Sequence, residues 1–230
     1  MLCKIDGLMK IALLSIVMVL FSFRPPALQQ ASKVVEELDK LGYFKFSDQG
    51  NIAKLKSELM ENFSRHKILS TVIDDETLLP YDHRLYFCDG ESLFEAGGLE
   101  EYLRYAQHAF EKRVLKLKWA NEISSQKGNV LSHRITVNGK EYVAFEGNMN
   151  RSDIWGIAQR NFYQLLNDQL EIQGSSERVY PISAGEEGQF VFLTEELFDY
   201  ITKTFYQGEG FKRHEIILPM ERWEIMMGFR

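Results

Sequence analysis

The residues whose types and spacing could do chemistry lie between positions 82 and 95 of this 230-residue chain. Carboxylates and an imidazole gather there, and such groups serve as general acids and bases in hydrolases. This hypothesis predicts that the turn after Cys88 lines a cleft and holds a buried carboxylate with a raised pKa. A solvated acidic turn is the simpler alternative. The candidate residues are Asp82, His83, Asp89, Glu91 and Glu95.

Cys88 and His83 together also suggest a thiolate nucleophile with an imidazole base. The two residues are five positions apart, so in an extended strand their side chains point to opposite faces. They would also be separated by roughly 16 Å along that strand. This geometry argues against a local catalytic pair, and a small buried apolar side chain is the favoured interpretation of Cys88.

The sequence lacks the motifs that would identify a reaction. No stretch matches the Gly-rich dinucleotide or phosphate-binding patterns, and Leu218 stands where an H-E-x-x-H motif beginning at His214 would need its second histidine. Glu209, His214 and Glu215 could coordinate a metal, but the end of a surface strand explains them more simply. We therefore expect no cofactor and no metal.

A short strand and a long helix must position the candidates at 82–95. Residues 84–88 are rich in β-prone side chains, and Pro80 bars a helix from running into them. From Leu99 to Leu117, apolar residues recur mostly every third or fourth position, which predicts an amphipathic helix. Val114 and Leu117 belong to its predicted buried face.

The remaining elements alternate between helices and hairpins. Asn138-Gly139 joins strands at 133–137 and 140–146 and is the strongest short hairpin signal, because both residues tolerate positive φ. Other helices are predicted at 28–41, 51–66, 152–170 and after Thr194, and other strands at 43–46, 68–73, 179–182, 189–193 and 214–218. An apolar tail is predicted at 223–229.

The pattern predicts an α+β fold, because the strands come in hairpins and not in β-α-β alternation. We expect a mainly antiparallel sheet built from hairpins with four to five packed helices, after an N-terminal hydrophobic leader. Residues 121–131 are polar and lose periodicity, which makes them the one plausible boundary. The halves would be 28–120 and 133–230, with one continuous domain as the alternative.

Composition excludes some classes of protein. The chain is 45% hydrophobic and 26% charged, which is typical of a globular protein. The net charge is −6 and no basic patch is interleaved with aromatic residues, so we expect no nucleic-acid partner. The aromatic share of 13% predicts a core rich in rings, or a face that grips a ligand.

The first 27 residues are predicted to be a signal peptide or an uncleaved membrane anchor. Lys10 is followed by an uncharged apolar run, 11–23, which is too short for a spanning helix of about twenty residues and suits a secretory signal. Met9 and Met1 are alternative starts. Removing the leader would also remove Cys3 and leave Cys88 alone, so we expect no intrachain disulfide.

The leader, the high aromatic content and the absence of a reactive constellation together favour an exported, non-enzymatic binding protein in the periplasm, the cell envelope or the medium. Its partner would be a protein or a small ligand, and an immunity or inhibitor type would present its acidic surface to a basic protein. Two alternatives stay open: a hydrolase using carboxylates and a histidine around 82–95, and a structural envelope protein with an extended exposed apolar patch. Membrane contact is expected only through an uncleaved leader, and the oligomeric state is left open.

Overall fold

The computed structural model describes residues 26–95, 97–182, 187–205 and 217–229, so the predicted leader lies almost wholly outside it. Its helices are α2 (Pro26–Lys40), α3 (Ile52–His66), α4 (Gly90–Phe94), α5 (Gly98–Lys112), α6 (Ile154–Ile172), α7 (Glu195–Thr204) and α8 (Met220–Met226), with the 3-10 turns η1 (Tyr43–Phe46) and η2 (Gln49–Asn51). Its strands are β1 (Leu85–Asp89), β2 (Trp119–Lys127), β3 (Val130–Val137), β4 (Lys140–Asn148), β5 (Glu177–Ile182) and β6 (Glu187–Thr194). Within this part of the chain, none of the helices is both long enough and apolar enough to cross a bilayer.

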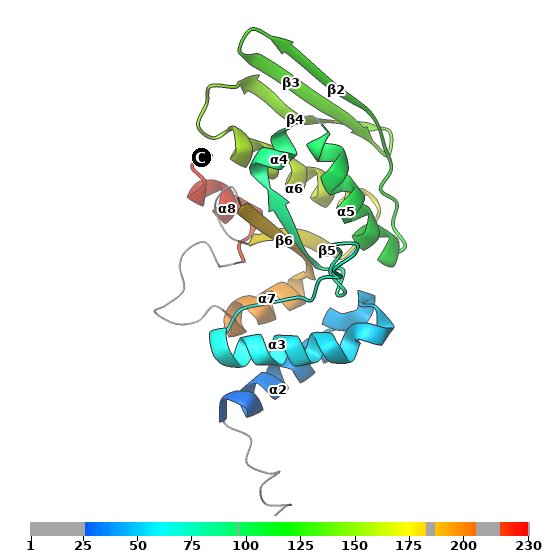
Figure 1. The fold of residues 1–230 in the computed structure, drawn as a ribbon, viewed down its shortest axis with the longest axis vertical. Helices are drawn as coiled ribbons and strands as arrows, with labels where there is room; N and C mark the ends of the chain where they lie inside the picture. Colours follow the sequence, from blue (N-terminus) through cyan, green and yellow to red (C-terminus); the bar gives the residue numbers. More distant parts are fainter. Residues whose placement is uncertain (1–25, 96, 183–186, 206–216, 230) are drawn as a thin grey trace, which may run out of the picture.

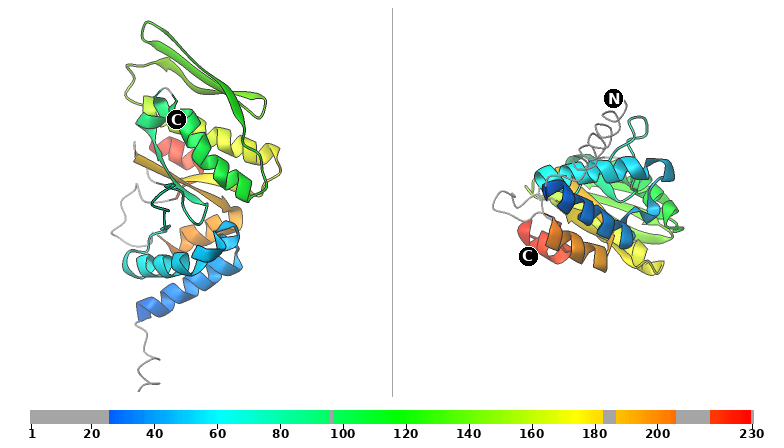
Figure 2. Two further views of the ribbon diagram at one scale, coloured as in Figure 1. Left: turned by 45° about the vertical axis from the view of Figure 1, so that its right-hand side comes forward. Right: turned by 90° about the horizontal axis from the view of Figure 1, so that it is seen from below.

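Four layers of secondary structure are stacked along the long axis of the molecule (Figure 1). Helices α2, α3 and α7 form the layer at one end and cover one face of a sheet with strand order β1-β6-β5. Helices α5 and α6 cover the other face of this sheet and carry a second sheet, β2-β3-β4, on their far side. The left view in Figure 2 shows the same order of layers.

The central strand β6 explains why this stack is stable. Phe190 and Phe192 point into the core formed with α5 and α6, whereas Val191 and Leu193 point into the core formed with α2, α3 and α7. Because neighbouring side chains of a strand face opposite sides, an uninterrupted apolar run is buried on both faces. β1 pairs antiparallel with β6, with Tyr86 opposite Phe190. The middle sheet therefore joins strands from both halves of the chain.

The predicted α+β class with antiparallel strands is confirmed, although the strands form two three-stranded sheets. The described residues contain seven α-helices. Five of them correspond to the predicted helices, and the short helices α4 and α8 were missed. α4 replaces the acidic turn expected after Cys88, and α8 begins before the segment expected as an apolar tail at 223–229 and ends inside it. The predicted hairpins at Asn138-Gly139 and between 179–182 and 189–193 are both present.

Two predicted strands are wrong. Residues 43–46 form η1, because Gly42 adopts φ 80° at the end of α2 and its carbonyl accepts a hydrogen bond from the Lys45 amide at 3.1 Å. Within the described residues, the run at 68–73 makes one bridge, between Ile73 and Pro80, and pairs with none of the strands. The predicted strand at 214–218 falls mostly outside the described residues, and Ile217 bridges Ile182.

Two predicted boundaries also differ. Residues 121–131 were expected to separate two halves, but they lie in β2 and in the start of β3. β2 is largely exposed, so it has no apolar periodicity to reveal it. Helix α5 ends at Lys112, because the chain turns at Val114 with φ 60° and the Leu115 amide bonds back to the Phe110 carbonyl at 2.9 Å. The Val114 side chain, expected to be buried, is 92% exposed.

The two-sided burial of the middle sheet can be tested with two phenylalanines. Phe192 is fully buried against the rings of Phe110 and Phe190, so Phe192→Ala should lower the free energy of unfolding by about 3–5 kcal/mol. Phe87, on the neighbouring strand, is 55% exposed, so Phe87→Ala should change it by less than about 0.5 kcal/mol. Urea unfolding measures both. Similar losses in the two variants would contradict the layered core.

Candidate functional site

The five candidates from the sequence lie in two separate places, at opposite ends of β1. Asp89 is the N-cap of α4, where its Oδ1 accepts a hydrogen bond from the Ser92 amide at 2.7 Å. Glu91 and Glu95 are exposed on and after this short helix. Asp82 and His83 are buried before the strand begins. The structure therefore brings Asp82 and His83 together but leaves the other three carboxylates apart from them.

Asp82 holds the chain where it enters β1. Its Oδ1 accepts hydrogen bonds from the amides of Arg84 at 2.9 Å and Leu85 at 3.3 Å, and its Oδ2 accepts one from the Tyr43 hydroxyl at 3.1 Å. A buried carboxylate needs such donors to replace water. These contacts describe a positioning role for Asp82 in the turn.

His83 adopts φ 49° and lies 3.1 Å from Asp48 through its Nε2 atom. Burial lowers the pKa of His83 despite this neighbour. For Asp48, burial raises the pKa, but hydrogen bonds and charge from Lys112 and His83 outweigh it and the net shift is downward. The His83 side chain is only 6% exposed, so a substrate could reach it only if the surrounding loops moved.

Cys88 is fully buried, and burial raises the pKa of its thiol far above the ordinary value. A thiolate is the nucleophilic form of cysteine, so this environment opposes nucleophilic chemistry. Its carbonyl accepts a hydrogen bond from Gln159 of α6 at 2.8 Å. Cys88 thus fits the apolar packing role that the sequence favoured.

A buried ion network next to His83 was missed by the sequence analysis. Glu177, at the start of β5, accepts hydrogen bonds from Arg84 through Oε1 at 2.6 Å and from Arg113 through Oε2 at 2.5 Å. The side chains of Arg84, Glu177 and Arg113 are 1%, 5% and 3% exposed. The sequence marks this network only by a charged residue next to the start of two strands, Arg84 at β1 and Glu177 at β5. Charged residues in such places are usually solvated.

The two arginines connect all the surrounding segments. Arg84 donates to the carbonyls of Gly42, Tyr43 and Phe192, so it ties the end of α2 and η1 to β6. Arg113 donates to the carbonyl of His83 at 3.0 Å and of Ala109 at 2.8 Å. Backbone carbonyls and Glu177 thus replace the water that the guanidinium groups lose on burial.

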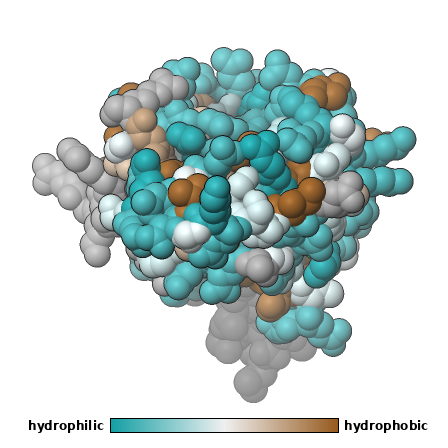
Figure 3. Space-filling model, turned by 90° about the horizontal axis from the view of Figure 1, so that it is seen from above, coloured by the Kyte–Doolittle hydropathy of each residue, from teal (hydrophilic) through white to brown (hydrophobic). Residues whose placement is uncertain are grey.

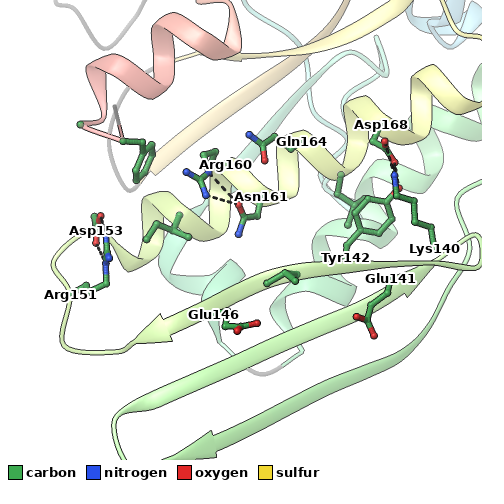
Figure 4. A pocket seen from close by; sticks show the side chains of 15 residues that line it. Lys140, Glu141, Tyr142, Glu146, Arg151, Asp153, Arg160, Asn161, Gln164 and Asp168 are labelled. Carbon is green, nitrogen blue, oxygen red and sulfur yellow. Dashed lines mark hydrogen bonds and ion pairs between the residues drawn. The ribbon is translucent and has the colours of Figure 1, made fainter.

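A surface depression with a volume of about 810 Å³ lies elsewhere, between β4 and α6. Figure 4 shows its polar side chains, which mostly pair with one another. At one end, Lys140 lies 2.8 Å from Asp168, which also accepts a hydrogen bond from the Tyr142 hydroxyl. At the other end, Arg151 lies 2.6 Å from Asp153.

The side chains of this groove are suited to polar contacts with a ligand more than to acid–base catalysis. Burial, and then the hydrogen bond to Asp168, raise the pKa of Tyr142 to about 12, so its hydroxyl stays protonated at neutral pH. Arg160 donates only to the neutral Asn161 at 3.2 and 3.3 Å and lies over the ring of Phe229. Its charge is not paired with a carboxylate within the described residues. Mixed, open and self-paired surfaces of this kind are common on protein exteriors.

A second depression lies along β1, with a volume of about 270 Å³, and is lined only by residues between positions 73 and 105. We call it the aromatic edge pocket. Its main lining residues are Leu78, Pro80, Phe87, Glu101, Tyr102 and Tyr105. Leu78 and Phe87 are 63% and 55% exposed, so the pocket continues onto an apolar surface.

The strand at the floor of this pocket has a free edge. The Phe192 amide donates to the Arg84 carbonyl, so Arg84, Tyr86 and Cys88 direct their backbone groups toward β6. The alternate residues direct theirs outward. The outward amides of Leu85 and Asp89 are bonded to Asp82 and to the Tyr102 hydroxyl.

Phe87 lies between Leu85 and Asp89, whose outward amides both have hydrogen-bond acceptors. Its outward N–H and C=O groups find no hydrogen-bond partner among the described residues.

Acidic side chains surround this edge. Glu101 lines the pocket, and Asp75 and Glu76 are exposed in the loop between its lining residues Ile73 and Leu78. No ion pair with a cation forms at these three carboxylates within the described chain. Hydrogen bonds from Thr77, and then from Tyr81, lower the pKa of the adjacent Asp74 to about 2, so this carboxylate is charged at neutral pH.

The outer face of the β2-β3-β4 sheet, which Figure 3 views from above, is largely hydrophilic. Ile123, Val130 and Val143 of this sheet are 57%, 51% and 38% exposed. Apolar side chains on this face stand as separate spots and not as one continuous patch. This face therefore shows no extended exposed apolar patch, which is the feature expected of a structural envelope protein.

Comparison with known protein families, curated proteins and solved structures finds no significant match to this chain. In residues 26–95, 97–182, 187–205 and 217–229, no group of three or more His, Cys, Asp and Glu side chains could hold a metal ion. A candidate site is therefore inferred from the geometry of the aromatic edge pocket and of the buried ion network.

The buried ion network predicts a large effect of one neutral substitution. Glu177→Gln keeps the shape of the side chain but leaves two buried guanidinium groups without a counter-charge. We expect a loss of about 3–5 kcal/mol in the free energy of unfolding. Glu146→Gln, which weakens an exposed pair with Arg134, should cost at most about 1 kcal/mol. Equal losses by urea unfolding would show that Glu177 does not balance the arginines.

His83 predicts a loss of stability in mild acid. Its folded-state pKa lies below the ordinary 6.5, so the unfolded chain takes up the proton first as the pH falls. The free energy of unfolding should therefore decrease between about pH 7 and pH 5. His83→Asn, which tolerates the positive φ, should reduce this decrease. The exposed His66→Asn variant should keep it, and an unchanged pH dependence in His83→Asn would contradict the assignment.

Proposed function

We propose that this protein is an exported, non-enzymatic binding protein whose partner is another protein. The free backbone edge at Phe87 carries the proposal, because an exposed strand edge can pair with an extended segment of a second chain. The flanking aromatic edge pocket would take a side chain of that segment. The hydrophobic leader, residues 1–27, supports a place in the periplasm, the cell envelope or the medium.

Charge gives the chemistry of the partner. Glu101 lines the pocket together with the rings of Tyr102 and Tyr105, and Asp75 and Glu76 are exposed in the loop between the lining residues Ile73 and Leu78. None of these three carboxylates forms an ion pair within the described residues. Carboxylates and aromatic faces both attract Lys and Arg side chains. The partner segment would be extended and basic, which fits an immunity or inhibitor protein that covers a basic surface.

The alternatives receive less support. A hydrolase around 82–95 would need Asp82 and His83 to act with Asp89, Glu91 or Glu95, yet β1 separates these two groups. A structural envelope role would need a broad apolar surface, and the face in Figure 3 is largely hydrophilic. Both remain open as hypotheses, and substrate screens and self-assembly assays address them.

The proposal is tested by recovering the partner from an envelope extract with the tagged chain from Leu28 onward. A single stoichiometric protein should bind, and its affinity should fall with added salt. Tyr105→Ala and Glu101→Lys should each weaken binding about tenfold or more, as expected for central aromatic and charged contacts. Glu111→Lys makes the same charge change on an exposed position of α5 that does not line the pocket, and should bind normally.

Two results would count against this function. Binding that ignores both Tyr105→Ala and Glu101→Lys would place the interface elsewhere. Binding that is independent of salt would remove the acidic surface from the mechanism. Once the partner is known, N-methylation of the segment's backbone should abolish binding, because it removes the donors that pair with β1.

A further inference from the structure

A further crevice, separate from the β4–α6 groove and the aromatic edge pocket, lies beside the buried ion network. The end of α2, η1, the end of α5 and the segment before β5 meet there. Its volume is about 360 Å³. Arg84, Arg113 and Glu177 line it from the interior, and Lys45, Ser176 and Thr194 line it from the other segments. Lys45 and Ser176 are exposed, so the crevice opens to solvent. It shares no lining residue with the aromatic edge pocket or with the β4–α6 groove.

Arg113 is held rigidly in this crevice. Its Nε atom donates to Glu177 at 2.5 Å, and its Nη1 atom donates to the His83 and Ala109 carbonyls. The guanidinium lies between two rings, 4.3 Å from the centroid of Phe46 and 4.7 Å from that of Phe192. A planar cation fixed in this way loses little entropy when it binds a ligand.

One donor of this side chain is left over. The Nη2 atom of Arg113 is buried and has no hydrogen-bond partner in the described part of the chain. By contrast, all three nitrogens of the Arg84 guanidinium donate to groups of the protein. A buried cationic N–H without an acceptor is costly, and charged acceptors make the strongest bonds to it.

The charges around the crevice favour a negative ligand. Both oxygens of Glu177 are already used by the two arginines, so this carboxylate is neutralised within the network. Lys45 adds a further positive charge and takes part in no ion pair within the described residues. The crevice therefore holds three cations and one carboxylate, although the whole chain has a net charge of −6.

We propose that this crevice binds a small oxyanion, a phosphate or carboxylate group that is free or carried by a larger molecule. One oxygen of the anion is directed to Arg113 Nη2, and Lys45 and the Ser176 hydroxyl contact the others. Because Nη2 is buried, this contact requires a small shift of the side chains that cover it. The ligand would stabilise the junction of α2, α5 and β5. This site is independent of the partner surface along β1.

The first experiment is a titration of the chain from Leu28 onward with phosphate and with acetate, against chloride at equal ionic strength. At least one oxyanion should raise the Tm by several degrees more than chloride does, because it binds only the folded state. The side-chain Nε–Hε signal of Arg113 should shift in the same titration. A response to phosphate alone identifies a phosphoryl ligand, and a response to acetate alone identifies a carboxylate.

Rim variants keep the buried network intact and make the test specific. Lys45→Glu should weaken oxyanion binding about tenfold. Lys127→Glu makes the same charge change at the exposed end of β2, in the sheet at the other end of the stack, and should not alter binding (Figure 1). The proposal is overturned if neither oxyanion exceeds chloride, if the Arg113 signal does not move, or if the two variants behave alike.

Discussion

Glu177 lies between two buried guanidinium groups, and the arrangement of the layers depends on this contact. Its oxygens bind Arg84, at the entry to β1, and Arg113, just after α5. Arg84 in turn bonds the carbonyls of η1, of the end of α2 and of β6. Burying charges is costly and requires protein acceptors in place of water, which here bind all three guanidinium nitrogens of Arg84 and two of the three of Arg113. This requirement fixes how the end-layer helices meet the middle sheet.

The same contact determines which surfaces stay available. Arg84 and Leu85 are neighbours, but they face different hollows: Arg84 lines the positive crevice, and Leu85 lines the aromatic edge pocket. Because Asp82 and Arg84 hold the start of β1 in place, the outward backbone groups of Phe87 are presented by a rigid strand. A rigid edge loses less entropy on binding than a mobile loop would.

Local patterns predicted the elements that depend on local physics. Periodicity predicted α3 and α5, and Asn138-Gly139 predicted the β3–β4 turn, because these signals lie within a few residues of one another. The Arg84–Glu177 pair joins residues 93 positions apart, and no local pattern marks it. The strand predicted at 43–46 failed for a related reason: Tyr43 and Phe44 are buried aromatic residues, and their β propensity was outweighed by packing after the turn at Gly42.

The candidate site was predicted only in its location. The stretch 73–105 does form a hollow, but Asp82 and His83 serve the turn into β1, and the groups that face solvent are Phe87, Tyr105 and Glu101. A sequence shows which residues are reactive, whereas a strand edge becomes a binding surface only because no neighbouring strand covers it. β1 has an uncovered edge because it is the outer strand of the sheet β1-β6-β5. This strand order depends on contacts between residues far apart in the chain. The proposed recognition therefore depends on topology, and the buried charges that hold the topology leave one arginine donor without a protein acceptor in the described residues.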